Sequence, residues 1–105
     1  GAIGAGIALL FAPKKGEELR NDLFHDCKSL ISVYIPSTVT RIEDSVFYNC
    51  SSLEEIHCSA ATPPIAYEYT FRSEVNTVKL YVPVGSLEKY QSADYWKNFV
   101  NIIEE

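Results

Sequence analysis

A 23-residue period runs through the middle of the chain and constrains its fold more than any single residue does. Residues 24–30 are echoed by residues 47–53, so that a Phe, a Cys, a Ser and a Leu return in step. A third, looser copy begins at Phe71. Self-similarity at a period of about 20 to 50 residues is typical of solenoids, in which each unit buries its apolar side only against its neighbours. The period therefore predicts the architecture of the chain, but it does not identify a particular ligand.

The size and charge of the chain limit the classes of partner that it can have. Its 105 residues are enough for one domain with a core of its own. Its formal net charge of −5 makes duplex DNA and anionic lipid electrostatically unfavourable partners. We therefore expect no nucleic-acid partner.

Residues 1–12 are apolar and rich in Gly and Ala, and Pro13 ends the run. The run is shorter than the roughly 20 apolar residues that cross a bilayer. Residues 16–23 are predicted to form a short polar helix, with Leu19 and Leu23 four residues apart on one face. Because the chain contains no Met, we expect it to be a processed or trimmed product.

From Phe24 onward the pattern changes to short strands and turns. Alternating apolar residues predict main strands around Val33–Ile35, Ile56–Cys58 and Leu80–Val82, with a further short strand over 39–42. Thr62-Pro63-Pro64 predicts an extended segment without helix. Near the end, the pattern predicts a helix with Ser86 as its N-cap, continuing through Leu87 and Tyr90 to Trp96, and a last strand over 101–103.

Two parts of the chain resemble known families. The pattern Phe-x-x-Cys-x-Ser-Leu-x-x-Val-x-Ile-Pro-x-x-Val-x-x-Ile, over residues 24–42, resembles the BspA-type (Treponema pallidum-type) leucine-rich repeat. Residues 61–64 and 80–102 are similar to the C-terminal end of such arrays in Bacteroides-like bacteria. Residues 6–20, with Ala12-Pro13-Lys14-Lys15-Gly16 at their centre, resemble the YtxH family of small membrane-associated bacterial proteins.

These resemblances imply a division of the chain and a location. Residues 1–23 would form an N-terminal apolar or helical segment, either YtxH-like or capping the first repeat. Residues 24–105 would form the repeat domain, with a C-terminal cap from about residue 84. The expected fold is a short α/β solenoid of the leucine-rich-repeat type, a right-handed coil with parallel strands and a helical cap. The repeat family implies an extracellular or cell-surface protein that acts in adhesion or protein binding, without enzymatic activity. Membrane contact is expected only if the apolar segment is longer in the intact gene.

The three cysteines are predicted to be structural. Cys27 and Cys50 occupy equivalent repeat positions, so they should stack about 5 Å apart, one strand spacing. Two buried thiols are the favoured interpretation, and a disulfide between them is the alternative. Cys58 matches the inward position of Ile35 and should lie in the core.

Catalytic and metal-binding patterns have little support. His57 and Cys58 are adjacent on a predicted strand, and neighbouring strand residues point to opposite faces. Two His and three scattered Cys without a Cys-x-x-Cys pair do not resemble a zinc site. No glycine-rich loop leads from a strand into a helix, as a phosphate or dinucleotide site would require. We therefore predict no catalytic residue, no metal and no cofactor.

Outward residues of the main strands form the candidate binding face. The period places Ser32, Glu55 and Lys79 in one column, and Tyr34, His57 and Tyr81 in a second. Tyr is favoured at interfaces because its ring is apolar and its hydroxyl polar. The alternative is a solvated sheet face on which β-propensity alone selected these residues.

Three functions are compatible with these patterns. The first is a non-enzymatic module at the cell surface that binds a host or bacterial protein or glycan through the candidate face. The second is a structural C-terminal end-piece of a longer repeat array, without a ligand of its own. The third is a membrane-associated, YtxH-like protein.

Overall fold

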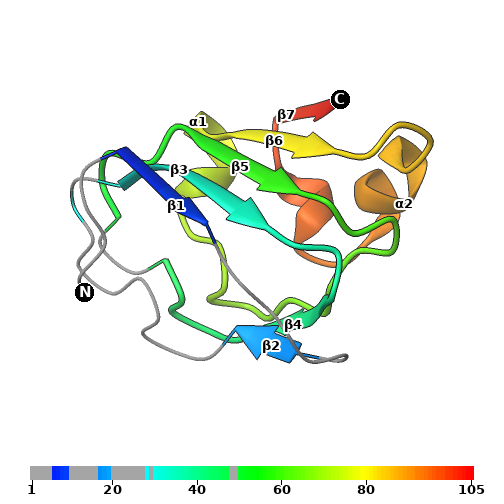
Figure 1. Cartoon of the computed structure of the whole chain (residues 1–105), viewed down its shortest axis with the longest axis horizontal. Coiled ribbons are helices and arrows are strands. Elements are labelled where there is room, and N and C mark those ends of the chain that lie inside the picture. Colours follow the sequence, from blue (N-terminus) through cyan, green and yellow to red (C-terminus); the bar gives the residue numbers. More distant parts are fainter. Residues whose placement is uncertain (1–5, 10–16, 20–27, 29, 48–49) are drawn as a thin grey trace.

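Two parallel β-sheets dominate the computed structural model, which describes residues 6–9, 17–19, 28, 30–47 and 50–105 (Figure 1). The larger sheet has five strands in the order β1-β3-β5-β6-β7. The smaller sheet pairs β2 (Glu17–Leu19) with β4 (Val39–Ile42). The strands of the larger sheet are β1 (Gly6–Leu9), β3 (Leu30–Ile35), β5 (Glu55–Cys58), β6 (Lys79–Val82) and β7 (Asn101–Glu104).

The register of the larger sheet follows the sequence period. Val33 pairs with Ile56, 23 residues further on, and Ile56 pairs with Leu80, 24 residues further on. Leu80 in turn pairs with Ile102, 22 residues later, so the last strand continues the repeat. The predicted parallel strands are thus confirmed. The right-handed coil and the boundary at residue 23 stay predictions.

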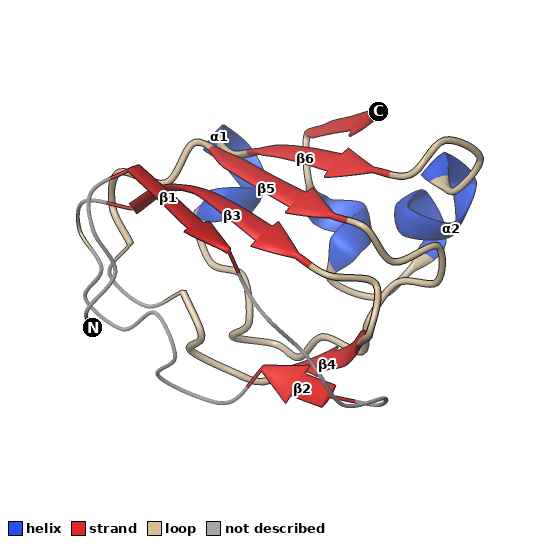
Figure 2. Ribbon diagram, viewed as in Figure 1, coloured by secondary structure: helices blue, strands red, loops and turns tan. Residues whose placement is uncertain are grey.

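The core lies against one face of this sheet. Val33, Ile56 and Leu80 are fully buried and form an inward ladder. Three short helices complete the described structure: α1 (Glu74–Thr77), α2 (Leu87–Ser92) and the 3₁₀ helix η1 (Trp96–Asn98). Figure 2 shows α1 and α2 near opposite ends of β6, and both helices contact β7, whereas β2 and β4 form a separate small sheet.

An aromatic cluster holds the C-terminal cap together. The Trp96 ring packs edge-on against Phe71 and Tyr90, with ring centroids 4.7 and 5.1 Å away. Phe99 packs edge-on against Phe71 at 4.9 Å. The Trp96 indole Nε1 donates a 2.7 Å hydrogen bond to the carbonyl of Pro64, which ties the cap to the extended Pro63-Pro64 segment.

The C-terminal helix is shorter than the sequence predicted. It was expected to reach Trp96, but α2 ends at Ser92 because Ala93 is extended, at φ −82° and ψ 139°. Ser86 does precede the helix, yet its hydroxyl donates to the Pro83 carbonyl instead of capping it. The carboxylate of Glu104, on β7, accepts hydrogen bonds from the Gly85 and Leu87 amides in its place. The start of α2 is therefore stabilised by a tertiary contact.

The helical expectation for the N-terminal segment is wrong where the structure describes it. Residues 17–19 form β2, which pairs with β4, and residues 6–9 form β1, which pairs with β3. An isolated helix of eight residues is marginal in water. Strand pairing instead satisfies the backbone groups along the edges of β3 and β4. The rest of the segment, 1–5, 10–16 and 20–23, lies outside the described residues.

Candidate binding face

The register brings the predicted face residues together in two columns. Ser32 pairs with Glu55 and Glu55 with Lys79, while Tyr34 pairs with His57 and His57 with Tyr81. The columns continue on β7 as Asn101 and Ile103. We call the set Ser32, Tyr34, Glu55, His57, Lys79 and Tyr81 the binding face; its role in binding stays a prediction.

The expectation that these columns are exposed throughout is wrong. His57 is only 9% exposed and Ser32 only 8%, whereas Tyr34 is 36% exposed. Tyr81 is intermediate and Lys79 exposed. In the second column the middle ring, His57, is covered by Tyr34 on one side and Tyr81 on the other. In the first column Ser32 lies between β1 and β5 and is the most buried member, whereas Glu55 is partly exposed and Lys79 exposed.

The three rings of the second column form one continuous stack. The Tyr34 and His57 centroids are 4.3 Å apart and their planes differ by 9°. His57 and Tyr81 are 4.4 Å apart and differ by 5°. These separations are close to the spacing of neighbouring strands, about 4.8 Å, so flat rings in register stack with little adjustment. Both faces of the His57 ring are therefore covered by tyrosines, and the stack presents ring edges to the solvent.

Two carboxylates bind the edge of the His57 ring. Nδ1 lies 2.6 Å from Oε2 of Glu105, and Nε2 lies 2.8 Å from Oε1 of Glu55. An ionised carboxylate can only accept hydrogen bonds, so both ring nitrogens must carry protons to satisfy both contacts. This arrangement is that of an imidazolium between two carboxylates.

The pKa of His57 is determined by opposing effects. Burial lowers the pKa because it disfavours the charged ring. The hydrogen bonds and negative charges of Glu105 and Glu55 raise it and together outweigh burial, so the pKa lies above its ordinary value. The proton on His57 is consequently held more tightly than in an unfolded chain.

Glu105 was missed by the sequence analysis. It is 48 residues from His57 in sequence and follows β7, which is not adjacent to β5 in the sheet. Its backbone N–H donates to the Val82 carbonyl, which extends the ladder between β6 and β7 by one residue. The predicted strand over 101–103 was the one available signal, since the carboxyl ends of parallel strands meet at the same end of a sheet.

The cysteines of the described part are buried. Cys58 is 3% exposed, in the core, as predicted. Burial raises the pKa of its thiol, and the Tyr90 hydroxyl lies 3.2 Å from its sulfur while donating to the Ala60 carbonyl at 2.6 Å. A thiol with a raised pKa is a poor nucleophile. Cys50 is also buried, but its expected stacking with Cys27 concerns a residue outside the described part.

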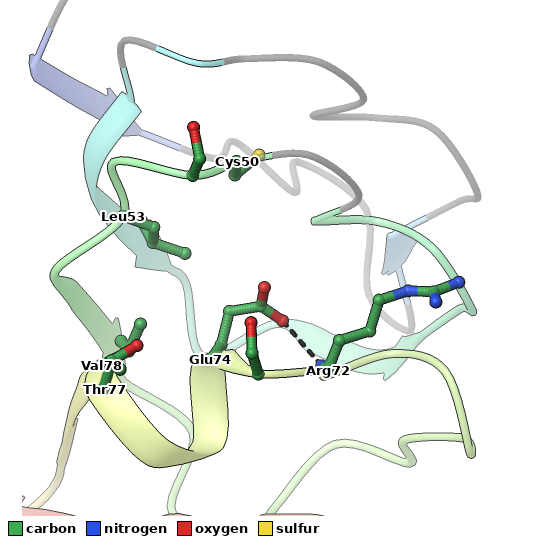
Figure 3. Close-up of a pocket in the computed structure, with 8 residues that line it drawn as sticks. Cys50, Leu53, Arg72, Glu74, Thr77 and Val78 are labelled. Atoms are coloured by element: carbon green, nitrogen blue, oxygen red, sulfur yellow. Dashed lines mark hydrogen bonds between the residues drawn. The ribbon is translucent and has the colours of Figure 1, made fainter.

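A separate cavity of about 230 Å³ lies between the turn at Cys50 and helix α1 (Figure 3). Its wall includes Arg72 and Glu74, and the Arg72 backbone N–H donates to the Glu74 carboxylate at 2.7 Å. The remaining lining residues are Cys50, Ser51, Leu53, Ser73, Thr77 and Val78. None of the binding-face residues contributes to this cavity.

No metal-binding group of three His, Cys, Asp or Glu residues occurs among the described residues. Glu55 and Glu105 contact opposite nitrogens of one ring, so they do not converge on a single ion. In the same part of the chain, no helix is long and apolar enough to span a bilayer.

The stability of the chain should depend on pH through His57. A raised folded-state pKa contributes stability that is fully present below the unfolded value, about 6.5, and is lost as the pH rises through the folded value. We expect the stability difference between the wild type and His57→Gln to be largest near pH 5.5 and to shrink toward about pH 9. Urea unfolding across this range measures the difference, and the NMR titration of the His57 ring reports the pKa directly.

The second histidine of the chain supplies the control for this measurement. His25→Gln removes an imidazole at a position outside the binding face. It should leave the pH profile attributed to His57 in place. A stability difference for His57→Gln that grows with rising pH would contradict the assignment.

Parallel strands that recur at a nearly constant spacing, with equivalent side chains stacked in columns, define a β-repeat protein with one aromatic face. The chain belongs to the family described as the BspA type leucine-rich repeat region (6 copies), whose model matches residues 8–102. No curated protein matches the chain. The match includes residues 8–23, and the resemblance of this segment to YtxH proteins is not supported by these comparisons.

Proposed function

We propose that the chain is a non-enzymatic interaction module that binds its partner through the binding face. The partner would be a protein or glycan on a host or bacterial surface, and the chain would act outside the cell or at its surface. Membership of the BspA type leucine-rich repeat family is consistent with a protein-interaction module. We also propose that the parallel strands form one right-handed solenoid coil of the leucine-rich-repeat type.

The stack of Tyr34, His57 and Tyr81 is the observation that carries this proposal. The rings are already held by stacking and by the two carboxylates, so binding would cost little side-chain entropy. Neither tyrosine hydroxyl has a hydrogen-bond partner among the described residues, which leaves both able to bind a ligand. Exposed Ile103, 39% accessible, lies beside Tyr81 and adds apolar contact area.

The ring geometry also limits how a ligand can bind. Because the ring faces cover one another, a sugar cannot insert between them and stack on a face of His57. A partner would instead contact ring edges and hydroxyls. Hydrogen-bonding groups are therefore expected to matter more than stacking at the centre of the face.

Removal of both tyrosine rings should weaken partner capture. In pull-downs against host extracellular proteins and mucin glycans, Tyr34→Ala with Tyr81→Ala should reduce capture about tenfold, because clustered aromatic residues dominate interface energies. The lost stacking should cost about 1–2 kcal/mol of stability, which circular dichroism melts would record.

Two further variants sharpen this test. Tyr34→Phe with Tyr81→Phe keeps the stack and removes only the hydroxyls, so it should bind with intermediate strength. Tyr69→Ala removes a ring that is 51% exposed and outside the face, and it should bind like the wild type. Unchanged capture by the folded double-Ala variant would refute the proposal.

The alternative function is a structural end-piece of a longer array. The aromatic cluster of Phe71, Tyr90, Trp96 and Phe99 favours it, because a solenoid end needs a cap over its core. Many additional 23-residue units upstream in the gene, together with a double-Ala variant that binds normally, would support this alternative.

A further inference from the structure

The contacts of His57 can all be satisfied only when its ring is charged. Both ring nitrogens lie within hydrogen-bond distance of a carboxylate oxygen, at 2.6 and 2.8 Å. A neutral imidazole has one N–H and one lone pair. Loss of the proton therefore leaves one of the two carboxylates facing a lone pair, without a donor.

Few groups near the two carboxylates can replace the N–H donor that the His57 ring loses. Glu105 has His57 as the side-chain partner of its carboxylate among the described residues. Besides His57, the Glu55 carboxylate has one further donor, the Ser32 hydroxyl, whose Oγ lies at the long distance of 3.5 Å from Oε1. The remaining charged or titratable groups on this face are Tyr34 on β3 and Lys79 and Tyr81 on β6. Glu104 on β7 pairs with Val82, a residue of the opposite sheet face, and its carboxylate accepts the Gly85 and Leu87 amides.

Both carboxylates can be reached from solvent. The side chain of Glu55 is 37% exposed and that of Glu105 is 51% exposed, whereas that of His57 is only 11% exposed. A carboxylate released by the ring would thus lie at the surface, next to the edges of two tyrosine rings. That position can accept a group from outside more readily than the buried ring can.

We propose that the proton of His57 regulates this face: the charged ring neutralises the two carboxylates and holds one oxygen of each, and loss of the proton frees one carboxylate for a cationic side chain of a partner protein. The inference rests on the proposed function of the face. It adds that the partner presents a segment bearing Arg or Lys. It also adds that this segment binds when the His57 ring is neutral.

Charge and hydrogen bonding favour a cationic group as the occupant. With a neutral ring, two carboxylates lie on this face, and Lys79 is the one cation of the binding face, opposite Glu55 in the register. A guanidinium can donate to a carboxylate in a bidentate fork, and the tyrosine hydroxyls provide further acceptors. A protonated His57 would repel the guanidinium and would already hold one oxygen of each carboxylate. The net charge of −5 also attracts a basic segment.

The test uses the full chain and a short probe peptide, acetyl-Gly-Arg-Gly-Arg-Gly-amide. Arg stays charged at all relevant pH values, so a change in affinity reports on the protein. NMR titrations near pH 5.5 and near pH 9 should show peptide affinity rising about fivefold with pH, the effect of one exposed ion pair. The same peptide with citrulline in place of Arg is neutral and should show no rise.

Two protein variants locate the effect. His57→Gln cannot be charged, so its peptide affinity should be the same at both pH values and similar to that of the wild type near pH 9. The double variant Glu55→Gln with Glu105→Gln lacks both carboxylates, so it should bind the Arg peptide weakly at both pH values. Circular dichroism checks that this variant is folded. Wild-type affinity that does not change with pH, or that rises equally for the citrulline peptide, would overturn the inference.

The outcome can be separated from that of the proposed function. If the double-Ala tyrosine variant loses partner capture but the Arg peptide shows no pH dependence, the face binds a partner and the regulation is refuted. If the citrulline peptide binds as tightly as the Arg peptide, the partner contact is not cationic, and a neutral protein or glycan takes its place. If capture is normal in the double-Ala variant, the proposed function fails irrespective of pH.

Discussion

Replacing Trp96 with alanine is expected to lower the free energy of unfolding by about 4 kcal/mol, the range found for large aromatic residues removed from a core. Trp96 is 1% exposed and packs against Phe71 and Tyr90. Its removal would leave a cavity inside this aromatic cluster. It would also leave the Pro64 carbonyl without its indole donor. Urea unfolding monitored by circular dichroism measures the loss.

Two variants serve as controls for the Trp96 measurement. Trp96→Phe keeps an aromatic ring but loses the hydrogen bond, so it should cost about half as much as the alanine variant. Val84→Ala changes a side chain that is 77% exposed and should cost less than about 0.5 kcal/mol. A Trp96→Ala cost no larger than that of Val84→Ala would show that the aromatic cluster does not hold the cap.

Replacing Ile56 with alanine is expected to cost about 2–4 kcal/mol, as for other buried aliphatic residues. Ile56 is fully buried on β5, the central strand of the larger sheet, and lies between Val33 and Leu80 in the inward ladder. Both neighbouring strands would lose packing at once. Thermal and urea unfolding of the variant would measure the cost.

A smaller substitution at the same site tests the packing argument. Ile56→Val removes one methyl group and should cost about 1 kcal/mol. Lys79→Ala, at an exposed position of the adjacent strand, should change stability by less than about 0.5 kcal/mol. Equal losses for the valine and alanine variants would contradict a well-packed ladder.

The main strands were predictable because two signals agree in them. Val33, Ile56 and Leu80 each lie in a short alternating segment, and each recurs at the repeat period. Alternation places a residue on one face of a strand, and the period sets which residues are neighbours across strands. Together they predict the columns of the binding face.

The N-terminal segment was not predictable in the same way. Its Leu19 and Leu23 match a helical spacing, and no copy of the Phe-x-x-Cys motif marks it as a repeat. Residues 17–19 are nevertheless a strand, because β4 offers an edge to which they can pair. The deciding interaction is with another segment, so the local pattern gave the wrong answer.

The repeat period is enough to predict which residues share a column, because a period of one structural unit places equivalent side chains side by side on neighbouring strands. The period does not predict that the rings of Tyr34, His57 and Tyr81 stack in contact, nor that Glu55 and Glu105 hold the His57 ring between them; both features depend on contacts made in the folded chain. The contact of Glu105 with His57 joins residues 48 apart, and Glu105 lies two residues beyond Ile103, the β7 member of the column. This contact forms because the Glu105 side chain extends across the end of the sheet to the His57 ring. It links the geometry of the aromatic column to the protonation of His57.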